Sequence, residues 1–264
     1  MERLEKALNK AKDPSRKSAK SFTYSADDSI SIDYTQTKIH STDQEVLKDR
    51  RVVALEKYGI EAETFRLLRT KILKQLRDNN WTSFGVTAPS QGAGKSMVSV
   101  NLAIAMAKEV NQTVLLVDLD LKNPKIDWYF DINVKKGLSD YLDTDTSLSE
   151  ILINPSIERL VILPGKGRAI ESSELLTGPK MRKLVQEIKR RYKSRIVIFD
   201  LPPVLASDDV LASMDFFDAI LLVVAEGENK PEDIKKSLKM LSGSNLLGTV
   251  LNKAAKVPEH LGYY

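Results

Sequence analysis

Hydrophobic residues recur in two different patterns along this chain. In residues 61–78, Phe65, Leu68, Ile72 and Leu76 follow one another at intervals of three and four, which predicts an amphipathic helix. Downstream, short apolar runs alternate with segments of helical periodicity. These runs are SFGVTA (83–88), TVLLVD (113–118), RLVIL (159–163), RIVIFD (195–200), AILLVV (219–224) and LLGTVLN (246–252).

The alternation of strand and helix indicates the class of fold. The runs are apolar on both faces, as strands buried inside a parallel sheet are. Helical segments at 95–109, 178–191 and 231–242 lie between several of them. We therefore expect an α/β domain with a mostly parallel sheet flanked by helices on both faces.

The first fifty residues show neither the helical periodicity nor the apolar runs over a long stretch. Residues 2–12 place four apolar side chains at helical spacing, which predicts a short amphipathic helix. Such a helix needs a surface to pack on, and the sequence leaves its own domain and a partner equally open. Residues 13–50 are polar and poorly periodic, so we interpret residues 1–50 as a helix followed by a linker.

Composition narrows the class of protein. The chain has 264 residues, 42% of them hydrophobic, which suits one large domain with an appendage. A net charge of +4 is too mild to indicate a nucleic-acid partner. The absence of cysteine and the presence of only 2 histidines make thiolate and histidine metal sites unexpected. Neither a signal peptide nor a membrane-spanning run is recognisable, so we expect a cytoplasmic protein.

The stretch PSQGAGKS has the features of a phosphate-binding loop. It lies between an apolar run and a helical segment, and Gly92 and Gly94 allow backbone N–H groups to turn towards one anion. In this context Lys95 can reach β- and γ-phosphates, and the Ser96 hydroxyl can bind Mg²⁺. Pro89 replaces the first glycine of such loops, which removes one N–H at the outer end of the loop.

Three carboxylates are expected at the same edge of the sheet. Asp118 and Asp120 end one apolar run, and residues two apart on a strand point to the same side. Asp200 ends another run, where Pro202 and Pro203 stop the strand. Ligands of open α/β sheets bind beyond the carboxyl ends of the strands. The sequence therefore predicts a magnesium–nucleotide site at this edge.

Together, the phosphate loop, the hydrophobic-D-x-D stretch and the hydrophobic-D-x-P-P stretch resemble the Walker A, A′ and B motifs of the bacterial tyrosine kinases (BY-kinases). This family regulates the chain length and export of capsular polysaccharides and exopolysaccharides. The similarity extends from about residue 61 to residue 252. It implies a P-loop NTPase-like fold, ATP and Mg²⁺ as cofactors, and a protein-tyrosine autokinase that regulates exopolysaccharide polymerisation and export.

The resemblance also implies a role for each matching residue. Lys95, Asp118 and Asp120 are implied as catalytic residues, with Asp118 as the base for the tyrosine hydroxyl. The implied metal ligands are Ser96, Asp120 and Asp200. The implied nucleotide-binding residues are Gly92, Ala93, Gly94, Lys95, Ser96, Met97 and Asn252. For Asn252, which follows an expected strand, a turn-forming role fits the sequence equally well.

Two further stretches match the family. ETFRLLR has the E-x-x-R-x-x-R pattern, with Glu63, Arg66 and Arg69 on one face of the expected helix. An ordinary solvated face explains this spacing too, whereas the resemblance implies a surface for ring-like self-association. EHLGYY contains Tyr263 and Tyr264, which form either a docked aromatic end or, as the resemblance implies, an autophosphorylation site.

The resemblance completes the expected organisation. Residues 51–256 would form a P-loop kinase domain, and residues 257–264 a tail that carries the tyrosines. The implied partners are further copies of the chain, a separate membrane polysaccharide co-polymerase that recruits the kinase to the inner face of the membrane, and a cognate tyrosine phosphatase. Two features depart from the family: Lys122 replaces its usual arginine, and the tyrosine run is short.

Two other functions compete with the kinase. Partitioning and cell-division ATPases act as dimerisation switches and carry K-G-G-x-G-K, with a lysine where this chain has Ser90. A nucleotide-binding scaffold of a polysaccharide export complex would need little catalysis, and Lys122 and the short tail leave it open.

Overall fold

The computed structural model describes residues 37–167, 172–190 and 194–255. The expected N-terminal helix and both tail tyrosines lie outside these ranges. The sequence predictions for them are therefore not addressed by the structure.

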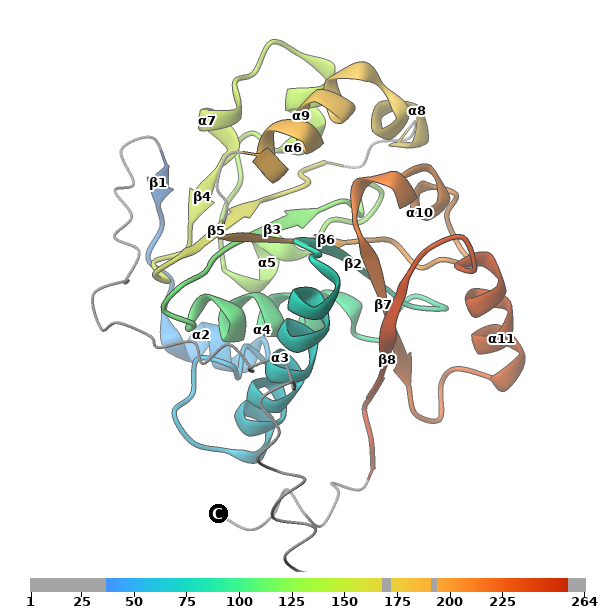
Figure 1. Ribbon diagram of the computed structural model, residues 1–264. Coiled ribbons are helices and arrows are strands. Elements are labelled where there is room, and N and C mark those ends of the chain that lie inside the picture. The colour runs from blue at the N-terminus through green and yellow to red at the C-terminus, as the bar shows by residue number, and fades with distance from the viewer. Residues whose placement is uncertain (1–36, 168–171, 191–193, 256–264) are drawn as a thin grey trace, which may run out of the picture.

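An eight-stranded sheet forms the centre of the described chain (Figure 1). Its order is β1-β4-β5-β3-β6-β2-β7-β8, and neighbouring strands are parallel except for β4 and β5. The predicted mostly parallel sheet is confirmed. The strands are β1 (Lys38–Ile39), β2 (Ser83–Thr87), β3 (Thr113–Asp118), β4 (Ile153–Asn154), β5 (Leu160–Leu163), β6 (Arg195–Asp200), β7 (Ala219–Ala225) and β8 (Leu246–Asn252).

Helices cover both faces of the sheet, as the sequence predicted (Figure 1). The α-helices are α2 (Gln44–Asp49), α3 (Ile60–Asn79), α4 (Lys95–Ala107), α5 (Ile126–Tyr129), α6 (Leu138–Asp143), α7 (Leu148–Ile151), α8 (Ser172–Thr177), α9 (Pro179–Arg190), α10 (Asp209–Ala212) and α11 (Pro231–Met240). A short 3-10 helix, η1 (Met214–Phe216), follows α10.

The core has two layers because alternate residues of each strand point to opposite faces. Val114 and Leu116 of β3 pack in the cluster that contains α3 and α4. Leu115 and Val117 pack in the opposite cluster, with α6, α8 and α9. Strands buried on both faces in this way explain why the sequence shows continuous apolar runs instead of alternation.

Residues 37–50 are more structured than the expected linker. β1 pairs with β4, and Leu47 of α2 is buried in the core. The Thr42 hydroxyl donates to the Phe130 carbonyl at 2.6 Å, and the Arg50 guanidinium pairs with Asp131 at 2.6 Å. These contacts are all with residues far away in the sequence, so local periodicity could not reveal them. The packed part of the chain therefore begins before residue 51.

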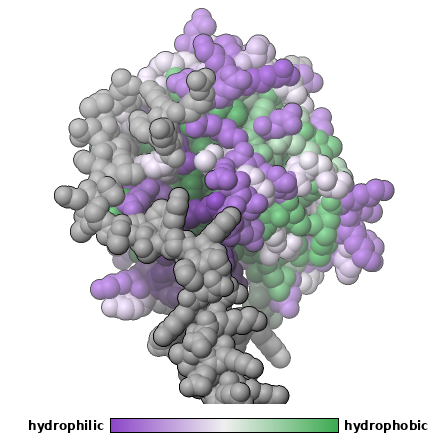
Figure 2. All heavy atoms as spheres, viewed as in Figure 1, coloured by the Kyte–Doolittle hydropathy of each residue, from purple (hydrophilic) through white to green (hydrophobic). Residues whose placement is uncertain are grey.

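The surface is mixed in character. Hydrophilic residues dominate much of the visible face, whereas hydrophobic residues reach the surface on the side of β7 and β8 (Figure 2). Leu246 and Leu251 of the edge strand β8 are exposed there. β8 is both the edge strand and the last strand of the described chain, so the described chain leaves the sheet at this edge.

Candidate active site

Three adjacent strands deliver the predicted site residues to one edge of the sheet. β6 lies between β3 and β2, and Asp200 is in register with Asp118 on one side and with Val86 on the other. The loop after β2 is the phosphate loop. The sheet therefore brings the three predicted motifs together, as expected from the rule for open α/β sheets.

The phosphate loop has the backbone that its glycines predicted. Gly92 and Gly94 adopt φ values of +87° and +90°, a region that favours glycine. Helix α4 begins directly afterwards at Lys95, so its free N–H groups and the positive end of its dipole face the loop. Pro89 does not disturb the entry to the loop, because the preceding Ala88 carbonyl accepts a hydrogen bond from Val204 at 2.9 Å.

Asn252 holds the inner side of this loop. Its side-chain amide donates to the Ala93 carbonyl at 2.8 Å. A Cβ atom added to Gly94 would lie 2.1 Å from the Asn252 amide nitrogen, so the loop can approach β8 only with glycine here. Asn252 also lines a cavity of about 290 Å³ together with Met97. The structure thus gives Asn252 a loop-clamping contact, while its predicted contact with a base stays a prediction.

Lys95 is the centre of the site. Its ammonium lies 2.8 Å from Asp120 and 3.5 Å from Asp200, and the side chain is largely buried. Burial alone would lower the pKa of Lys95, but the charges of Asp200 and Asp120 outweigh it and raise that pKa. The residue therefore remains a cation, held between two carboxylates.

Asp200 is held by two hydroxyl groups of helix α4. Ser96 donates to one carboxylate oxygen at 2.5 Å, and Ser99 donates to the other at 3.0 Å. Burial raises the pKa of Asp200, and the opposing charge of Lys95 counteracts part of this effect. Ser99 was not singled out in the sequence, although its position one turn after Ser96 places both on the same face of α4.

Asp118 is buried beneath the site. One of its oxygens accepts backbone N–H groups of Lys125 and Ile126 at 2.9 and 3.0 Å, and the other accepts that of Asp120 at 3.1 Å. Burial, followed by the charge of Asp200, raises the pKa of Asp118, while these N–H donors oppose the shift. In this conformation Asp118 shapes the loop between β3 and α5 (residues 119–125), which we call the A′ loop.

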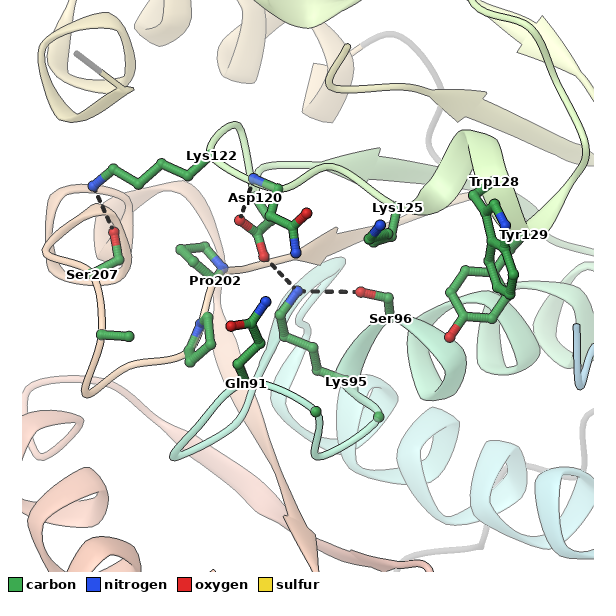
Figure 3. A pocket seen from close by; sticks show the side chains of 15 residues that line it. Gln91, Lys95, Ser96, Asp120, Lys122, Lys125, Trp128, Tyr129, Pro202 and Ser207 are labelled. Atoms are coloured by element: carbon green, nitrogen blue, oxygen red, sulfur yellow. Dashed lines mark hydrogen bonds and ion pairs between the residues drawn. The ribbon is translucent and has the colours of Figure 1, made fainter. Parts of the chain in front are cut away.

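A cavity of about 480 Å³ opens above these residues (Figure 3). Of the predicted carboxylates, Asp120 lines it, and Asp118 and Asp200 lie behind its wall with no exposed surface. The full lining is Gln91, Gly92, Gly94, Lys95, Ser96, Asp120, Lys122, Asn123, Lys125, Trp128, Tyr129, Pro202, Pro203, Ala206 and Ser207.

Two aromatic residues of α5 were missed in the sequence. Trp128 and Tyr129 line both cavities and meet edge to face, 5.0 Å apart (Figure 3). The Arg50 guanidinium stacks on the Trp128 ring at 4.9 Å. The sequence signal for these two residues was an aromatic pair soon after Asp118 and Asp120. The position of Arg50 beside this pair is set by the fold and is not visible in the sequence.

The donors around Lys95 fit a magnesium ion bound together with phosphate. Among the residues that the structure describes, no group of three or more histidine, cysteine or carboxylate side chains could hold a metal alone. Mg²⁺ usually takes one or two carboxylates, with substrate phosphates and water completing its octahedron. The Ser96 hydroxyl, Asp120 and Asp200 lie around one ammonium group and match that pattern.

The predicted self-association residues make contacts within the chain. Arg66 binds Glu63 at 2.6 Å on α3, and Arg69 reaches the end of α4, where it meets Glu109 at 3.1 Å and the Ala105 carbonyl at 3.3 Å. All three side chains keep some exposed surface. Their predicted role between subunits remains untested.

Comparison with known proteins identifies the family. The fold and the loop define a P-loop nucleotide-binding protein, and a family model described as an AAA domain matches residues 86–229. The tyrosine-protein kinase YwqD of Bacillus subtilis is 31% identical over 81% of this chain and 91% of its own length. The putative tyrosine-protein kinase EpsB of Ralstonia nicotianae is 30% identical over 76% of this chain but 27% of its own length.

A solved structure agrees with these matches. The chimerical protein CapA2B2 superposes with a TM-score of 0.73 at 28% identity, covering 83% of this chain and 95% of that one. The chain belongs to the bacterial tyrosine-protein kinase family. None of the helices in the described ranges combines the length and the apolar character that a membrane span requires.

Proposed function

We propose that this chain is a Mg²⁺–ATP-dependent protein-tyrosine autokinase that phosphorylates Tyr263 and Tyr264 of neighbouring copies and thereby regulates exopolysaccharide polymerisation and export. The observation that carries the proposal is the convergence of Lys95 with Asp120 and Asp200 beside a phosphate loop, in a chain of this family. Phosphoryl transfer depends mainly on positioning and electrostatic stabilisation, which this arrangement can supply.

The proposed reaction moves one phosphoryl group. The bond between the γ-phosphorus and the β,γ-bridging oxygen of ATP breaks, a bond to the phenol oxygen forms, and ADP leaves. Lys95 binds the phosphate oxygens, and Ser96, Asp120 and Asp200 hold the metal. A bound Mg²⁺ would neutralise charge on the β- and γ-phosphates.

The phenol proton goes to a carboxylate of the A′ loop. Asp118 is the proposed base, and because burial and the charge of Asp200 raise its pKa, its carboxylate accepts a proton more readily than an ordinary aspartate does. Because backbone N–H groups occupy both of its oxygens, the Lys125–Ile126 segment would have to move before a phenol could approach. Asp120 already lines the cavity and is the alternative acceptor.

The nucleotide would occupy both cavities. Its phosphates would lie against Gly92, Gly94 and Lys95, which line the larger cavity. The smaller cavity shares both glycines and adds Met97 and Asn252, so it is the proposed place of the base.

The dimerisation switch is the less favoured function. Ser90, at the place of the switch lysine, has an uncharged side chain whose hydroxyl accepts a hydrogen bond from Asn229 at 2.7 Å. A serine here cannot supply the cation of the switch motif.

Phosphosite mapping tests the proposed function. Wild-type protein incubated with Mg²⁺–ATP should carry phosphate on Tyr263 and Tyr264, and Asp118→Asn should carry little or none. The Tyr263→Phe/Tyr264→Phe variant should retain ATP binding without tail phosphate. ATP hydrolysis without phosphotyrosine in the wild type would favour the switch, and binding with neither product would favour the scaffold.

We also propose that α3 contributes to self-association. Arg66→Ala combined with Arg69→Ala should lower the oligomer mass measured by light scattering, because both side chains keep exposed surface, Arg66 beside Glu63 and Arg69 beside Glu109. Arg77→Ala, on an exposed position of the same helix, is the matched control. Because both side chains also make contacts within their own chain, each single substitution is measured as well, and its melting temperature shows whether it loosens the fold. An unchanged mass in all variants would indicate that this stretch is an ordinary solvated charged face with no role in self-association.

The remaining partners follow from the family. We propose a separate membrane polysaccharide co-polymerase that recruits the kinase to the inner face of the membrane, and a tyrosine phosphatase that reverses its action. EpsB, which extends far beyond the shared region, supports the idea that this kinase unit works with further segments.

A further inference from the structure

Lys122 leaves the A′ loop in an unexpected direction. Figure 3 shows its side chain extended away from Lys95 towards Ser207, on the loop that follows β6. Its ammonium donates to the Ser207 hydroxyl at 3.1 Å and lies 3.6 Å from one oxygen each of Asp208 and Asp209. Lys122 therefore connects two loops that border the larger cavity.

The far end of this connection is firmly anchored. Asp209 has no exposed surface, and its carboxylate accepts the Ser172 hydroxyl at 2.9 and 2.8 Å and the Ser173 hydroxyl at 2.7 Å. A buried carboxylate needs both hydrogen bonds and a nearby positive charge. Lys122 places a positive charge beside it, so the lysine is held by a group that is itself fixed to α8.

The near end lies next to the catalytic groups. Lys122 follows Asp120 by two residues, and Asp120 holds Lys95 at 2.8 Å. The loop that carries Ser207 begins after Asp200, whose carboxylate accepts the Ser96 hydroxyl. The connection thus links the A′ loop, which carries Asp120, to the loop that follows Asp200 at the end of β6.

We propose that Lys122 is a positioning residue for the magnesium–nucleotide site: it bridges the A′ loop to the β6–α10 loop and holds Asp120 at the right distance from Asp200. The inference rests on the proposed function for the identity of the ligand. Supporting residues that orient metal ligands typically change metal affinity or activity by about 10- to 100-fold when removed. The competing role is direct contact between Lys122 and a phosphate.

A double-mutant cycle separates the two roles. Lys122→Met, Ser207→Ala and the double variant are compared in full-length protein by titrating Mg²⁺ in the presence of a fluorescent ADP analogue. A bridge predicts that Lys122→Met raises the half-saturating Mg²⁺ concentration roughly 10-fold, that Ser207→Ala shifts it in the same direction, and that the double variant is no worse than Lys122→Met.

Controls isolate the bridge from general effects. Lys235→Met removes an exposed lysine of α11 that lines neither cavity and should leave the Mg²⁺ requirement within about twofold, since surface charges alone contribute little. Lys122→Arg should recover most of the affinity, because a guanidinium can still reach the acceptors of the β6–α10 loop. The Ser207 hydroxyl also accepts the N–H of Asp209 at 3.3 Å, and Ser207→Ala removes this contact too. Melting temperatures measured without nucleotide show how much stability that loss costs.

Three results would overturn the bridge. Effects of Lys122→Met and Ser207→Ala that multiply would indicate that Lys122 acts directly on the nucleotide. An equal effect of Lys235→Met would indicate a general effect of net charge, and a lowered melting temperature with an unchanged Mg²⁺ requirement would indicate a structural role only. Absence of phosphotyrosine in the wild type would refute the kinase proposal, while the binding cycle would still decide the role of Lys122.

Discussion

Replacing Lys95 by methionine is expected to abolish tyrosine phosphorylation and to destabilise the protein. Loss of the cation that we propose binds phosphate should reduce the rate by on the order of 10²–10³-fold or more. The variant also leaves three buried carboxylates without their counter-charge. Breaking a buried ion pair costs about 3–5 kcal/mol, which calorimetry or thermal unfolding would detect.

The pH dependence of this loss follows from the same carboxylates. The pKa values of Asp118 and Asp200 in the folded protein are raised above the unfolded value of about 3.9. The folded state therefore binds more protons than the unfolded state above pH ~4. Stability should fall as pH rises through this window, and more steeply in Lys95→Met than in the wild type. The Lys95→Met variant should accordingly be closest to wild-type stability at mildly acidic pH.

A lysine at the opposite end of the same helix provides the control. Lys108 follows α4 and donates to the Ala54 carbonyl at 2.6 Å. Lys108→Met should keep kinase activity near the wild-type rate. Equal loss of activity in both variants, or a Lys95→Met protein that phosphorylates tyrosine normally, would contradict the assignment of Lys95.

Asp118→Asn and Asp200→Asn are expected to have opposite effects on stability, although both should impair catalysis. Asp118 accepts fixed backbone N–H groups at both oxygens, and an asparagine amide would turn its own N–H groups towards one of these donors. The resulting unsatisfied donor costs about 1–3 kcal/mol. For a protein of this size, each kcal/mol lowers the melting temperature by roughly 2–4 °C.

Asp200 has partners that can adapt. Its carboxylate accepts hydroxyl groups of Ser96 and Ser99, which can rotate to accept from an amide, and the substitution removes a buried negative charge. Lys95, which pairs with Asp200 at 3.5 Å, keeps its closer partner Asp120 at 2.8 Å and is not left unpaired. Asp200→Asn should therefore melt at or above the wild-type temperature in the absence of nucleotide. Differential scanning fluorimetry of both variants checks the contrast, and a larger destabilisation by Asp200→Asn than by Asp118→Asn would refute it.

The regular part of the fold could be predicted because its signals are local. The bounds of strands β2, β3, β5, β6, β7 and β8 and of helices α3, α4, α9 and α11 lie within about two residues of the expected ones. Their apolar runs are continuous because both faces of the sheet are covered. Short elements such as β1, β4 and α2 carry no comparable periodicity. Tertiary contacts stabilise them: β1 pairs with β4, and Leu47 of α2 is buried in the core.

The sequence predicts which residues form the candidate site better than it predicts how their side chains are arranged. Loop glycines and strand-end carboxylates reveal themselves by sequence spacing, and adjacent strands bring them together as expected. The exposure of each carboxylate depends on side-chain contacts that spacing does not encode. Asp118 is covered because the A′ loop folds back on it, and Lys122 bridges to Asp209 because α10 happens to begin opposite.

A mixing experiment tests the central claim most directly. Lys95→Met protein with an intact tail is incubated with Mg²⁺–ATP and an active Tyr263→Phe/Tyr264→Phe partner, and the tail of the former is examined by mass spectrometry. We predict phosphate on Tyr263 and Tyr264 of the Lys95→Met chain only when the active partner is present. An active partner that hydrolyses ATP while those tyrosines stay unmodified would contradict the proposed transfer between subunits.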